Sequence, residues 1–364
     1  MNAMLLMPPA VCSIWLAARP PGRFKSESNL MTTRRSTGTT KVARSLWYIG
    51  PGKVELRAQP LGPPRHGEAQ VRTQFTGISR GTERLVLAGK VGQSEWTRMR
   101  APLQDGNFPF PVKYGYCAVG RVTAGPAELT DKTVFCLHPH QDWFNVAADR
   151  LTVVPEGVPA RRATLAANME TALNALWDSG AGPADRIRVV GGGIVGLLVA
   201  HLAGRLPGAD VTLVDVDASR AELAKHLGVG FTLPDQATGE ADLVFHTSAS
   251  AAGLDTAIRL AGEEGTIVEM SWYGETRVAV DLGGPFHSRR LQLISSQVGK
   301  VSPKRRIRWD YARRLQAALK LLEDARLDAL VAEAIPFDDA VVRIPAVLAA
   351  GASGIAPVLE YDTQ

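Results

Sequence analysis

Glycines at three fixed places in the run 191–196 are spaced to bind a phosphate group. The run is Gly-Gly-Gly-Ile-Val-Gly and matches the pattern G-x-G-x-x-G. Gly191 allows a tight turn, Gly193 lets the backbone approach a pyrophosphate, and Gly196 lets a helix pack closely on the preceding strand. Ile194 and Val195 open an apolar helix, whose first N–H groups and positive dipole end attract phosphate. The spacing predicts a dinucleotide-binding turn.

A carboxylate downstream indicates which dinucleotide this turn binds. Asp215 ends the next apolar run and lies nineteen positions after Gly196, close to the roughly 20 expected of the acid that binds the ribose hydroxyls. A carboxylate there would repel a 2′-phosphate, so we expect NAD in preference to NADP. Arg220 follows nearby and could soften that preference.

The segments around the turn alternate between strand-like and helix-like patterns. We expect strands at 186–192, 210–217, 241–248 and 265–274, with helices at 193–208, 219–228 and 251–265 between them. This alternation predicts an α/β fold with a doubly wound parallel sheet. Thr247 and Ser271 follow strand ends, where ligands bind in open parallel sheets, so both are candidate cofactor contacts.

The residues before this unit have a different pattern. Short strands and glycine-containing turns fill about 46–158, and a helical segment follows at 160–180. We therefore expect a mostly β domain at 44–160 that is completed by 300–364, and a Rossmann domain at 161–299. Residues 1–43 combine a proline-interrupted apolar stretch without a basic start and a polar block, so we expect a disordered extension there.

Composition limits the class of protein. The 364 residues are 45% hydrophobic and 21% charged, which suits a globular protein of about two domains. Three cysteines without a C-x-x-C pair argue against a disulfide framework and favour a reducing, cytoplasmic setting. No apolar run reaches the roughly 18 to 20 residues of a membrane span.

The formal net charge of +5 is spread along most of the chain. One dense basic cluster occurs at 300–308, and we favour a solvated loop over a substrate-anion site for it. No recognition motif accompanies the charge, so nucleic acid is not an expected partner. The expected partner is a small-molecule substrate.

Three further segments extend the pattern beyond the glycine turn. They are GISRGTE at 77–83, KYGYCAVGRV at 113–122 and ANMETALNAL at 167–176. Together with the turn, Asp215 and the domain order, they resemble the medium-chain dehydrogenase/reductase superfamily over about residues 46–360. The resemblance implies a GroES-like, mostly β catalytic domain before the Rossmann domain, hydride transfer with a nicotinamide cofactor, and a homodimer.

Zinc-dependent members of that superfamily hold the metal at three places, and this sequence differs at each. Ser79 stands where the first cysteine ligand is found, Tyr116 replaces a histidine, and Cys117 replaces the neighbouring glutamate. The third place falls among 167–169 (Ala-Asn-Met). Hydroxyl, phenol and thioether groups make a poor zinc set, so we expect a zinc-free enzyme. The pattern is most similar to the bacteriochlorophyllide dehydrogenase-like branch, from which we take the reaction class and not the pigment.

A zinc-free site needs side chains that polarise a carbonyl and accept a proton. By the resemblance Tyr116 takes a zinc ligand's place, so it is the favoured donor, with a core aromatic as the alternative. Ser79 and Thr82 could relay the proton. His138 and His140 flank a proline, so their side chains would point the same way along an extended segment. A general base, a structural pair and, less favoured, a metal site with one carboxylate all stay open for them.

Two neighbours in the helix at 167–176 are further candidates. Glu170 could act as an acid or base, or could be a solvated helix residue. The resemblance places Thr171 on the helix behind the nicotinamide. Its hydroxyl could instead bond back to its own helix.

The leading hypothesis is an NAD-dependent, zinc-independent oxidoreductase that interconverts a secondary alcohol and a ketone. A zinc-free enoyl or quinone reductase is the second hypothesis, although those relatives usually prefer NADPH, which Asp215 disfavours. The third is a dinucleotide-binding protein without turnover, because every zinc ligand is replaced.

Overall fold

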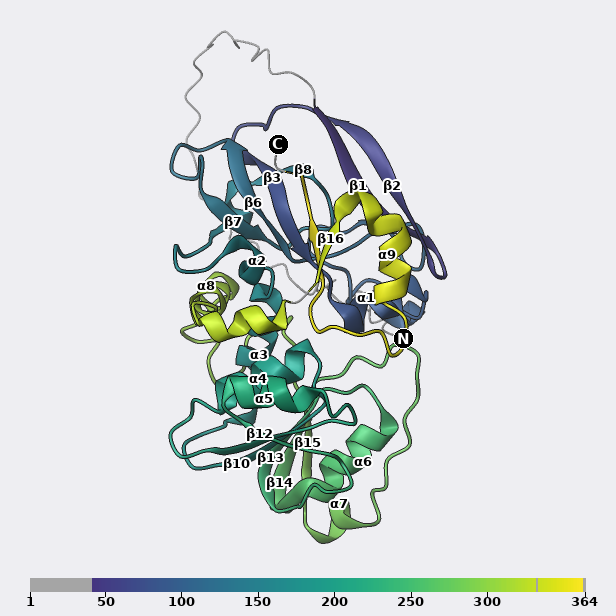
Figure 1. Cartoon of the computed structure of the whole chain (residues 1–364), viewed down its shortest axis with the longest axis vertical. Coiled ribbons are helices and arrows are strands. Elements are labelled where there is room, and N and C mark those ends of the chain that lie inside the picture. The colour runs from purple at the N-terminus through teal and green to yellow at the C-terminus, as the bar shows by residue number, and fades with distance from the viewer. Residues whose placement is uncertain (1–40, 332, 363–364) are drawn as a thin grey trace, which may run out of the picture.

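A sheet-rich unit and a parallel-sheet unit divide the chain (Figure 1). The computed structural model describes residues 41–331 and 333–362. Most of the expected extension at 1–43 lies outside the described residues. Its last three residues, 41–43, already belong to strand β1, which spans Lys41–Gly50.

Two sheets build the first unit. The smaller has the order β2-β1-β5-β4 and the larger the order β16-β17-β3-β6-β7-β9, with β8 paired to β3. The strands are β2 (Lys53–Leu61), β3 (Glu68–Gly77), β4 (Asp105–Gly106), β5 (Val112–Lys113), β6 (Ala118–Ala124), β7 (Thr133–Cys136), β8 (Trp143–Ala147), β9 (Thr152–Val153), β16 (Ala334–Pro336) and β17 (Val358–Glu360). The Pro-Gly pair at 51–52 turns β1 into β2, as the sequence predicts.

The second unit is the doubly wound parallel sheet that the alternating pattern predicts. Its order is β12-β11-β10-β13-β14-β15, and every neighbouring pair is parallel. The strands are β10 (Arg186–Val190), β11 (Asp210–Val214), β12 (Gly230–Thr232), β13 (Ala241–His246), β14 (Ala261–Glu269) and β15 (Gln292–Ser295). The strand order reverses beside β10, and such switch points are where open α/β sheets bind ligands.

Helices occur in both units. They are α1 (Arg80–Leu87), α2 (Ala160–Ala163), α3 (Ala166–Ser179), α4 (Ile194–Ala203), α5 (Arg220–Leu227), α6 (Ala251–Leu260), α7 (Pro285–Ser288), α8 (Tyr311–Leu321) and α9 (Ala340–Val347). Helices α1 and α9 lie on strands of the first unit, and α4, α5 and α6 lie on the parallel sheet. The 3-10 helices are η1 (Gln93–Glu95), η2 (Ala148–Arg150), η3 (Ala325–Leu330) and η4 (Phe337–Asp339). No helix in the described ranges is long and apolar enough to cross a membrane.

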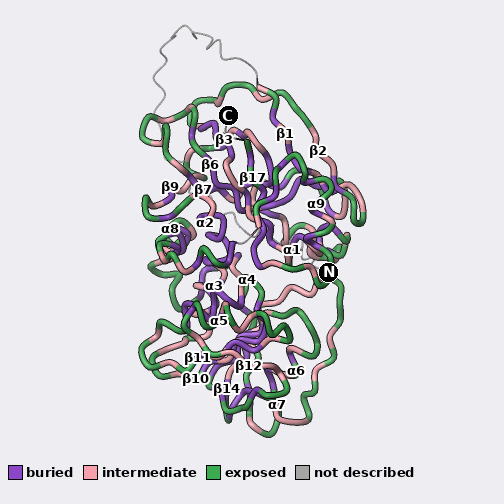
Figure 2. Tube along the Cα trace, in the orientation of Figure 1, coloured by how far each residue is buried: buried purple, intermediate pink, exposed green. Residues whose placement is uncertain are grey.

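The position of α4 explains why its sequence is apolar on all sides. The helix packs on β10 and β11 with one face and is covered by α3 with another. Leu197, Leu198 and Val199 are fully buried, and Figure 2 shows buried chain concentrated around α3, α4 and the central strands. A helix enclosed in this way needs no polar face.

The C-terminal segment divides between the two units. From Ala334 onward it joins the first unit, where β17 pairs with β3 and α9 packs against β2. Helix α8 instead packs against α3. There Arg314 forms a fully buried ion pair with Glu170, with 2.9 Å between nitrogen and oxygen. The expected return of the tail to the β domain therefore describes the segment from Ala334 onward and not α8.

Candidate active site

A cleft of about 850 Å³ is lined by residues of both units, including the turn that follows β10. Twelve of the sequence-predicted site residues line it: Ser79, Thr82, Tyr116, Thr171, Gly191, Gly193, Ile194, Val195, Asp215, Arg220, Thr247 and Ser271. The other four, Gly196, His138, His140 and Glu170, lie behind its walls.

The glycine turn has a geometry that suits a phosphate-bearing ligand. Gly191 adopts φ +111°, a backbone conformation that glycine takes readily. A Cβ on Gly196 would lie 1.9 Å from the carbonyl oxygen of Gly191, so the helix can approach the strand only without a side chain there. A Cβ on Gly193 would meet no atom within 4 Å, which leaves space for a ligand at the first turn of α4, where N–H groups lack helical partners.

Asp215 is held in the cleft by the turn itself. One carboxylate oxygen accepts a hydrogen bond from the N–H of Gly192 at 2.5 Å, and the other accepts one from the N–H of Asp217 at 2.8 Å. Each carboxylate oxygen can accept a second bond, so the side chain still has acceptors for ribose hydroxyls. The guanidinium of Arg220 pairs with Asp217 at 3.1 Å rather than with Asp215.

The hydroxyls predicted to contact the cofactor also stabilise the cleft walls. Thr247 donates to the carbonyl of Gly191 at 2.8 Å, and Ser271 accepts from the N–H of Ala249 at 3.0 Å. Thr171 donates to the carbonyl of Ala167 one turn earlier in α3, at 2.9 Å. The Thr171 hydroxyl therefore bonds back to its own helix, which is the alternative that the sequence left open. The Thr171 side chain also lines the cleft.

Three hydroxyl groups, those of Ser79, Thr82 and Tyr116, meet in the cleft. The phenol of Tyr116 donates to the hydroxyl of Ser79 at 2.5 Å. Burial raises the pKa of Tyr116 well above its ordinary value, although the hydroxyls of Ser79 and Thr82 act in the opposite direction. The phenol therefore stays protonated at neutral pH and can donate a hydrogen bond to a substrate oxygen.

A buried carboxylate that the sequence did not single out positions this hydroxyl cluster. Glu83 accepts from the N–H of Ser79 at 2.7 Å, from the phenol of Tyr48 at 2.6 Å and from His140 Nε2 at 3.0 Å. Burial alone would raise the pKa of Glu83, but His140 and these donors bring it below its usual value. Glu83 follows Thr82 directly in α1 and lies between Arg80 and Arg84, so the sequence suggests an exposed ion pair and gives no signal of a buried acid.

The two histidines that flank Pro139 have separate places in the first unit. His140 is fully buried, with Nδ1 2.6 Å from the Thr76 hydroxyl and Nε2 on Glu83. His138 stacks on Phe144 with ring centres 3.8 Å apart, and burial lowers its pKa to about 3. Their side chains do not converge on one ligand, and neither lines the cleft. The geometry therefore favours structural roles for the pair.

Glu170 fits neither of the interpretations that the sequence left open. It is neither solvated nor exposed to the cleft, because Arg314 donates to its Oε1 at 2.9 Å in the interior. Arg314 also donates to the carbonyl of Val298, which lines the cleft, at 2.5 Å. The pair thus supports the cleft wall from behind.

A second buried network lies at the carboxyl ends of β13 and β14. The Nδ1 atom of His246 lies 2.7 Å from the carboxylate of Glu269, and its Nε2 atom lies 2.7 Å from the hydroxyl of Ser248. Tyr273 donates to the same carboxylate at 3.2 Å. Ser248 and Tyr273 line the cleft, so the network fixes the loop segments that face the ligand.

The side chains at the expected metal position do not form a zinc set. Of the residues at the three expected ligand places, Ser79, Tyr116 and Asn168 line the cleft and offer a hydroxyl, a phenol and an amide, whereas zinc takes thiolate, imidazole or carboxylate ligands. Across the described ranges, no group of three or more His, Cys, Asp or Glu side chains could hold a metal ion. The residues present therefore do not fit zinc, and no step below depends on it.

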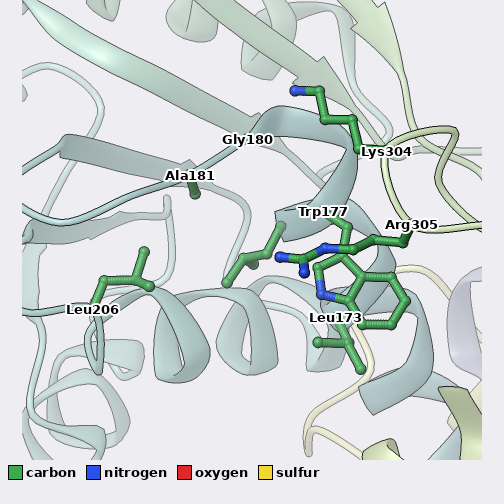
Figure 3. A pocket seen from close by; sticks show the side chains of 8 residues that line it. Leu173, Trp177, Gly180, Ala181, Leu206, Lys304 and Arg305 are labelled. Atoms are coloured by element: carbon green, nitrogen blue, oxygen red, sulfur yellow. The ribbon is translucent and has the colours of Figure 1, made fainter. Parts of the chain in front are cut away.

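A smaller hollow of about 410 Å³ lies apart from the cleft and accounts for part of the basic cluster. Leucines 173, 176 and 206 line it together with Trp177, Lys304 and Arg305. The Arg305 guanidinium lies beside the Trp177 ring (Figure 3), 5.6 Å from its centre. Lys304 and Arg305 thus lie outside the cleft, and their side chains are exposed, as expected of a solvated loop.

Comparison with known proteins agrees with this architecture. No family model matches the chain. Over 169 residues it is 30% identical to 2-dehydro-3-deoxy-L-galactonate 5-dehydrogenase of Pseudoalteromonas atlantica, a match that covers 43% of this chain and 49% of that protein. The chain therefore spans about half the length of this curated relative.

Two solved structures from Escherichia coli match over most of their length. One is L-idonate 5-dehydrogenase, with a TM-score of 0.72, 15% identity, and coverage of 88% of this chain and 99% of that one. The other is described as a short chain alcohol dehydrogenase in complex with NADH, with a TM-score of 0.68, 15% identity and the same coverage. These likenesses show that the chain has the fold of these dehydrogenases, with a sheet-rich GroES-like domain joined to a Rossmann domain.

Proposed function

We propose that the protein is an NAD-dependent, zinc-independent oxidoreductase of the medium-chain dehydrogenase/reductase superfamily that interconverts a secondary alcohol and a ketone. The observation that carries this proposal is one cleft with two kinds of wall. The glycine turn and Asp215 line one part, and the hydroxyl cluster of Ser79, Thr82 and Tyr116 lines another. A dinucleotide site beside a protonated phenol is the arrangement that hydride transfer to a carbonyl needs.

The similar proteins support the reaction class. The curated relative is named as a dehydrogenase of a sugar acid, and one structural neighbour is named as the 5-dehydrogenase of L-idonate. The other neighbour is a complex with NADH. These names favour a hydroxylated, polar substrate. From the bacteriochlorophyllide dehydrogenase-like branch we retain alcohol oxidation with NAD, and not a pigment substrate.

The chain would hold the cofactor through the turn that follows β10. The N–H groups at the start of α4 would face the pyrophosphate, and Asp215 would accept hydrogen bonds from ribose hydroxyls. Bound NAD would supply the hydride acceptor in oxidation and NADH the donor in reduction. The carboxylate of Asp215 also supports the choice of NAD over NADP.

The hydroxyl cluster would handle the substrate oxygen. In ketone reduction Tyr116 donates a hydrogen bond to the carbonyl oxygen, and the developing alkoxide takes the phenol proton. The phenol has one proton, which it donates to Ser79 in the structure, so a bound substrate oxygen takes the place of Ser79 as acceptor. The Ser79 hydroxyl then donates to the phenol oxygen, passes its proton to it as the alkoxide forms, and takes a proton from solvent in the cleft. Alcohol oxidation is the reverse of these steps.

A pair of tyrosine variants tests this role. Tyr116→Phe should lower kcat by about 10²- to 10³-fold, the usual effect of removing one such donor, while NADH binding stays the same. Tyr114→Phe is the matched control, because Tyr114 also lines the cleft but has its ring centre 6.1 Å from that of Tyr116. Unchanged turnover in Tyr116→Phe would remove the tyrosine from the mechanism.

Metal analysis tests the zinc-independent part separately. We expect protein purified without chelators to contain less than stoichiometric zinc, and prolonged dialysis against a chelator to leave the rate unchanged. One tightly bound zinc per chain, lost together with activity, would contradict the proposal.

We also propose a homodimer. Strand β15 is the edge of the parallel sheet, and Leu293 on it is 40% exposed. An edge strand with an exposed apolar side chain can pair with a second copy. Light scattering during gel filtration should give twice the mass of the chain, and a monomer at micromolar concentration would contradict the proposal.

A further inference from the structure

The cleft carries an excess of positive charge. Its charged lining residues in the described part of the chain are four arginines, Arg80, Arg84, Arg100 and Arg220, against one acid, Asp215. A cleft lined by charges of one sign concentrates ligands of the other sign. The phosphates of a dinucleotide would neutralise some of the four arginines, and the positions of the arginines indicate which of them remain for another ligand.

Three of the arginines belong together beside the glycine turn. Burial and the neighbouring cations Arg84 and Arg220 lower the pKa of Arg80, so the three guanidinium groups influence one another. Arg220 lies against the turn, since a Cβ on Gly192 would come within 3.0 Å of its side chain. This group therefore lies where cofactor phosphates are expected.

Arg100 stands apart from that group and has only neutral partners. It follows η1 and donates to the carbonyl of Gln104 at 3.1 Å, the carbonyl of Gly106 at 3.0 Å and the side-chain oxygen of Asn107 at 2.8 Å. A guanidinium has five N–H groups, so two are left. These bonds hold the planar group in one orientation without neutralising its charge.

The acids near Arg100 in sequence are paired elsewhere. Glu95 lies 3.5 Å from Arg98, and Asp105 lies 3.6 Å from Lys113. Within the described residues Arg100 therefore has no carboxylate partner. A half-buried, oriented cation without a counter-ion, in the wall of a cleft, can bind an anion from solution.

Aromatic side chains connect Arg100 with the hydroxyl cluster. Asn107, which accepts from Arg100, precedes Phe108 in the chain, and the Phe108 ring is 5.8 Å from that of Tyr114. Tyr114 in turn lies edge to face with Tyr116 at 6.1 Å. Arg100, Tyr114 and Tyr116 all line the one cleft, so an anionic group on Arg100 would belong to a ligand that shares the cleft with the proton donor.

We propose that Arg100 binds an anionic group of the substrate, so that the substrate class is a hydroxy or keto compound with a carboxylate or phosphate at the end remote from the reacting carbon. The inference rests on the proposed function. The planar guanidinium offers its remaining N–H groups to two oxygens of one anion, which a point charge such as lysine does less well.

A panel of matched substrates and variants tests this assignment. The panel consists of six-carbon aldonates, the uncharged alditols of the same stereochemistry, and their terminal phosphates. Arg100→Gln should raise KM for the favoured anionic class by about 10- to 100-fold, the usual range for a lost charge-assisted hydrogen bond, and should raise KM for the uncharged alditols far less. Arg100→Lys should retain part of the affinity. Arg98→Gln, at an exposed arginine two residues away, is the control and should change neither class.

The outcomes separate the two proposals. Preference for carboxylates or for phosphates decides which anion Arg100 binds. If the enzyme oxidises alditols and the anionic substrates equally well, and Arg100→Gln raises KM for both classes by the same factor, the assignment of Arg100 is overturned. The proposed function then stays intact. Arg100-dependent stabilisation by an aldonate in a thermal shift, without NAD reduction on any panel member, would support the anion site and overturn the proposed function.

Discussion

The two walls of the cleft are built by different means. The Rossmann wall is mainly backbone: a glycine turn, the start of a helix and one carboxylate that the turn holds in place. The GroES-like wall is mainly side chains, whose positions depend on a buried carboxylate, Glu83, with one donor from its own helix start and two from other parts of the chain. An added side chain in the glycine turn should therefore disrupt the Rossmann wall. Removal of the Glu83 carboxylate should disrupt the GroES-like wall.

This difference separates binding from chemistry. A backbone wall can hold any ligand with the right phosphate spacing, so it fixes the cofactor class and little else. A side-chain wall sets which atom receives a proton and which substrate group is bound. Substitutions on the Rossmann wall should therefore impair cofactor binding, and substitutions on the GroES-like wall should impair turnover or stability.

The largest effect is expected from one methyl group on the Rossmann wall. Gly196→Ala places a Cβ 1.9 Å from the backbone oxygen of Gly191, so strand and helix must separate. We expect dinucleotide binding to be lost in a fluorescence titration and stability to fall by about 1–3 kcal/mol.

Gly193→Ala is the matched change for that prediction. Its Cβ would have no neighbour within 4 Å, so the protein should fold normally and only its NADH affinity should fall. If both variants lost stability equally, the turn would tolerate no side chain at either position. The close contact between helix and strand at Gly196 would then not be the specific cause.

The second prediction removes the buried acceptor of the other wall. Glu83→Ala leaves the N–H of Ser79, the phenol of Tyr48 and His140 without their shared partner. Because an unpaired buried donor costs about 1–3 kcal/mol, we expect the midpoint of chemical denaturation to fall strongly. Glu83→Gln keeps one acceptor oxygen and should lose less. If both variants kept wild-type stability and turnover, the network would not position the hydroxyl cluster.

Local patterns predicted the Rossmann half because its parts are close in sequence. The glycine turn runs directly into α4, and the alternation of segments indicated the parallel sheet. The acid at 215 follows one strand later and does accept from the turn. These relations depend on spacing along the chain, which a single sequence displays.

The GroES-like half was less predictable because its contacts join distant residues. Tyr48, Glu83 and His140 meet in one network, although Glu83 and His140 are 57 positions apart. Nothing in the spacing of His138 and His140 reveals that one stacks on an aromatic ring and the other bonds a carboxylate. The same holds for Glu170, whose partner Arg314 lies 144 positions away.

The third prediction concerns the cofactor preference set by Asp215. Asp215→Ser removes the charge that would repel a 2′-phosphate and the acceptor for Gly192, so NADH affinity should fall about tenfold and NADPH affinity should rise. Asp210→Asn is the control, since Asp210 lies at the opposite end of the same strand and pairs with Arg188 away from the cleft. Parallel titrations with both cofactors measure the ratio, and an unchanged ratio would contradict the role of Asp215.

The smallest effect at neutral pH is expected from a buried histidine of the GroES-like half, whose titration changes stability only in acid. Burial lowers the pKa of His138 to about 3, against roughly 6.5 in an unfolded chain. The unfolded state therefore binds a proton first, so the contribution of His138 to stability is complete above about pH 6.5 and is lost as the pH falls toward about 3. His138→Phe keeps the stack on Phe144 and removes the titration, so its acid-unfolding midpoint should move to lower pH. His66→Gln, at an exposed histidine, should leave the midpoint in place, and an equal shift in both variants would show that His138 is not the group responsible.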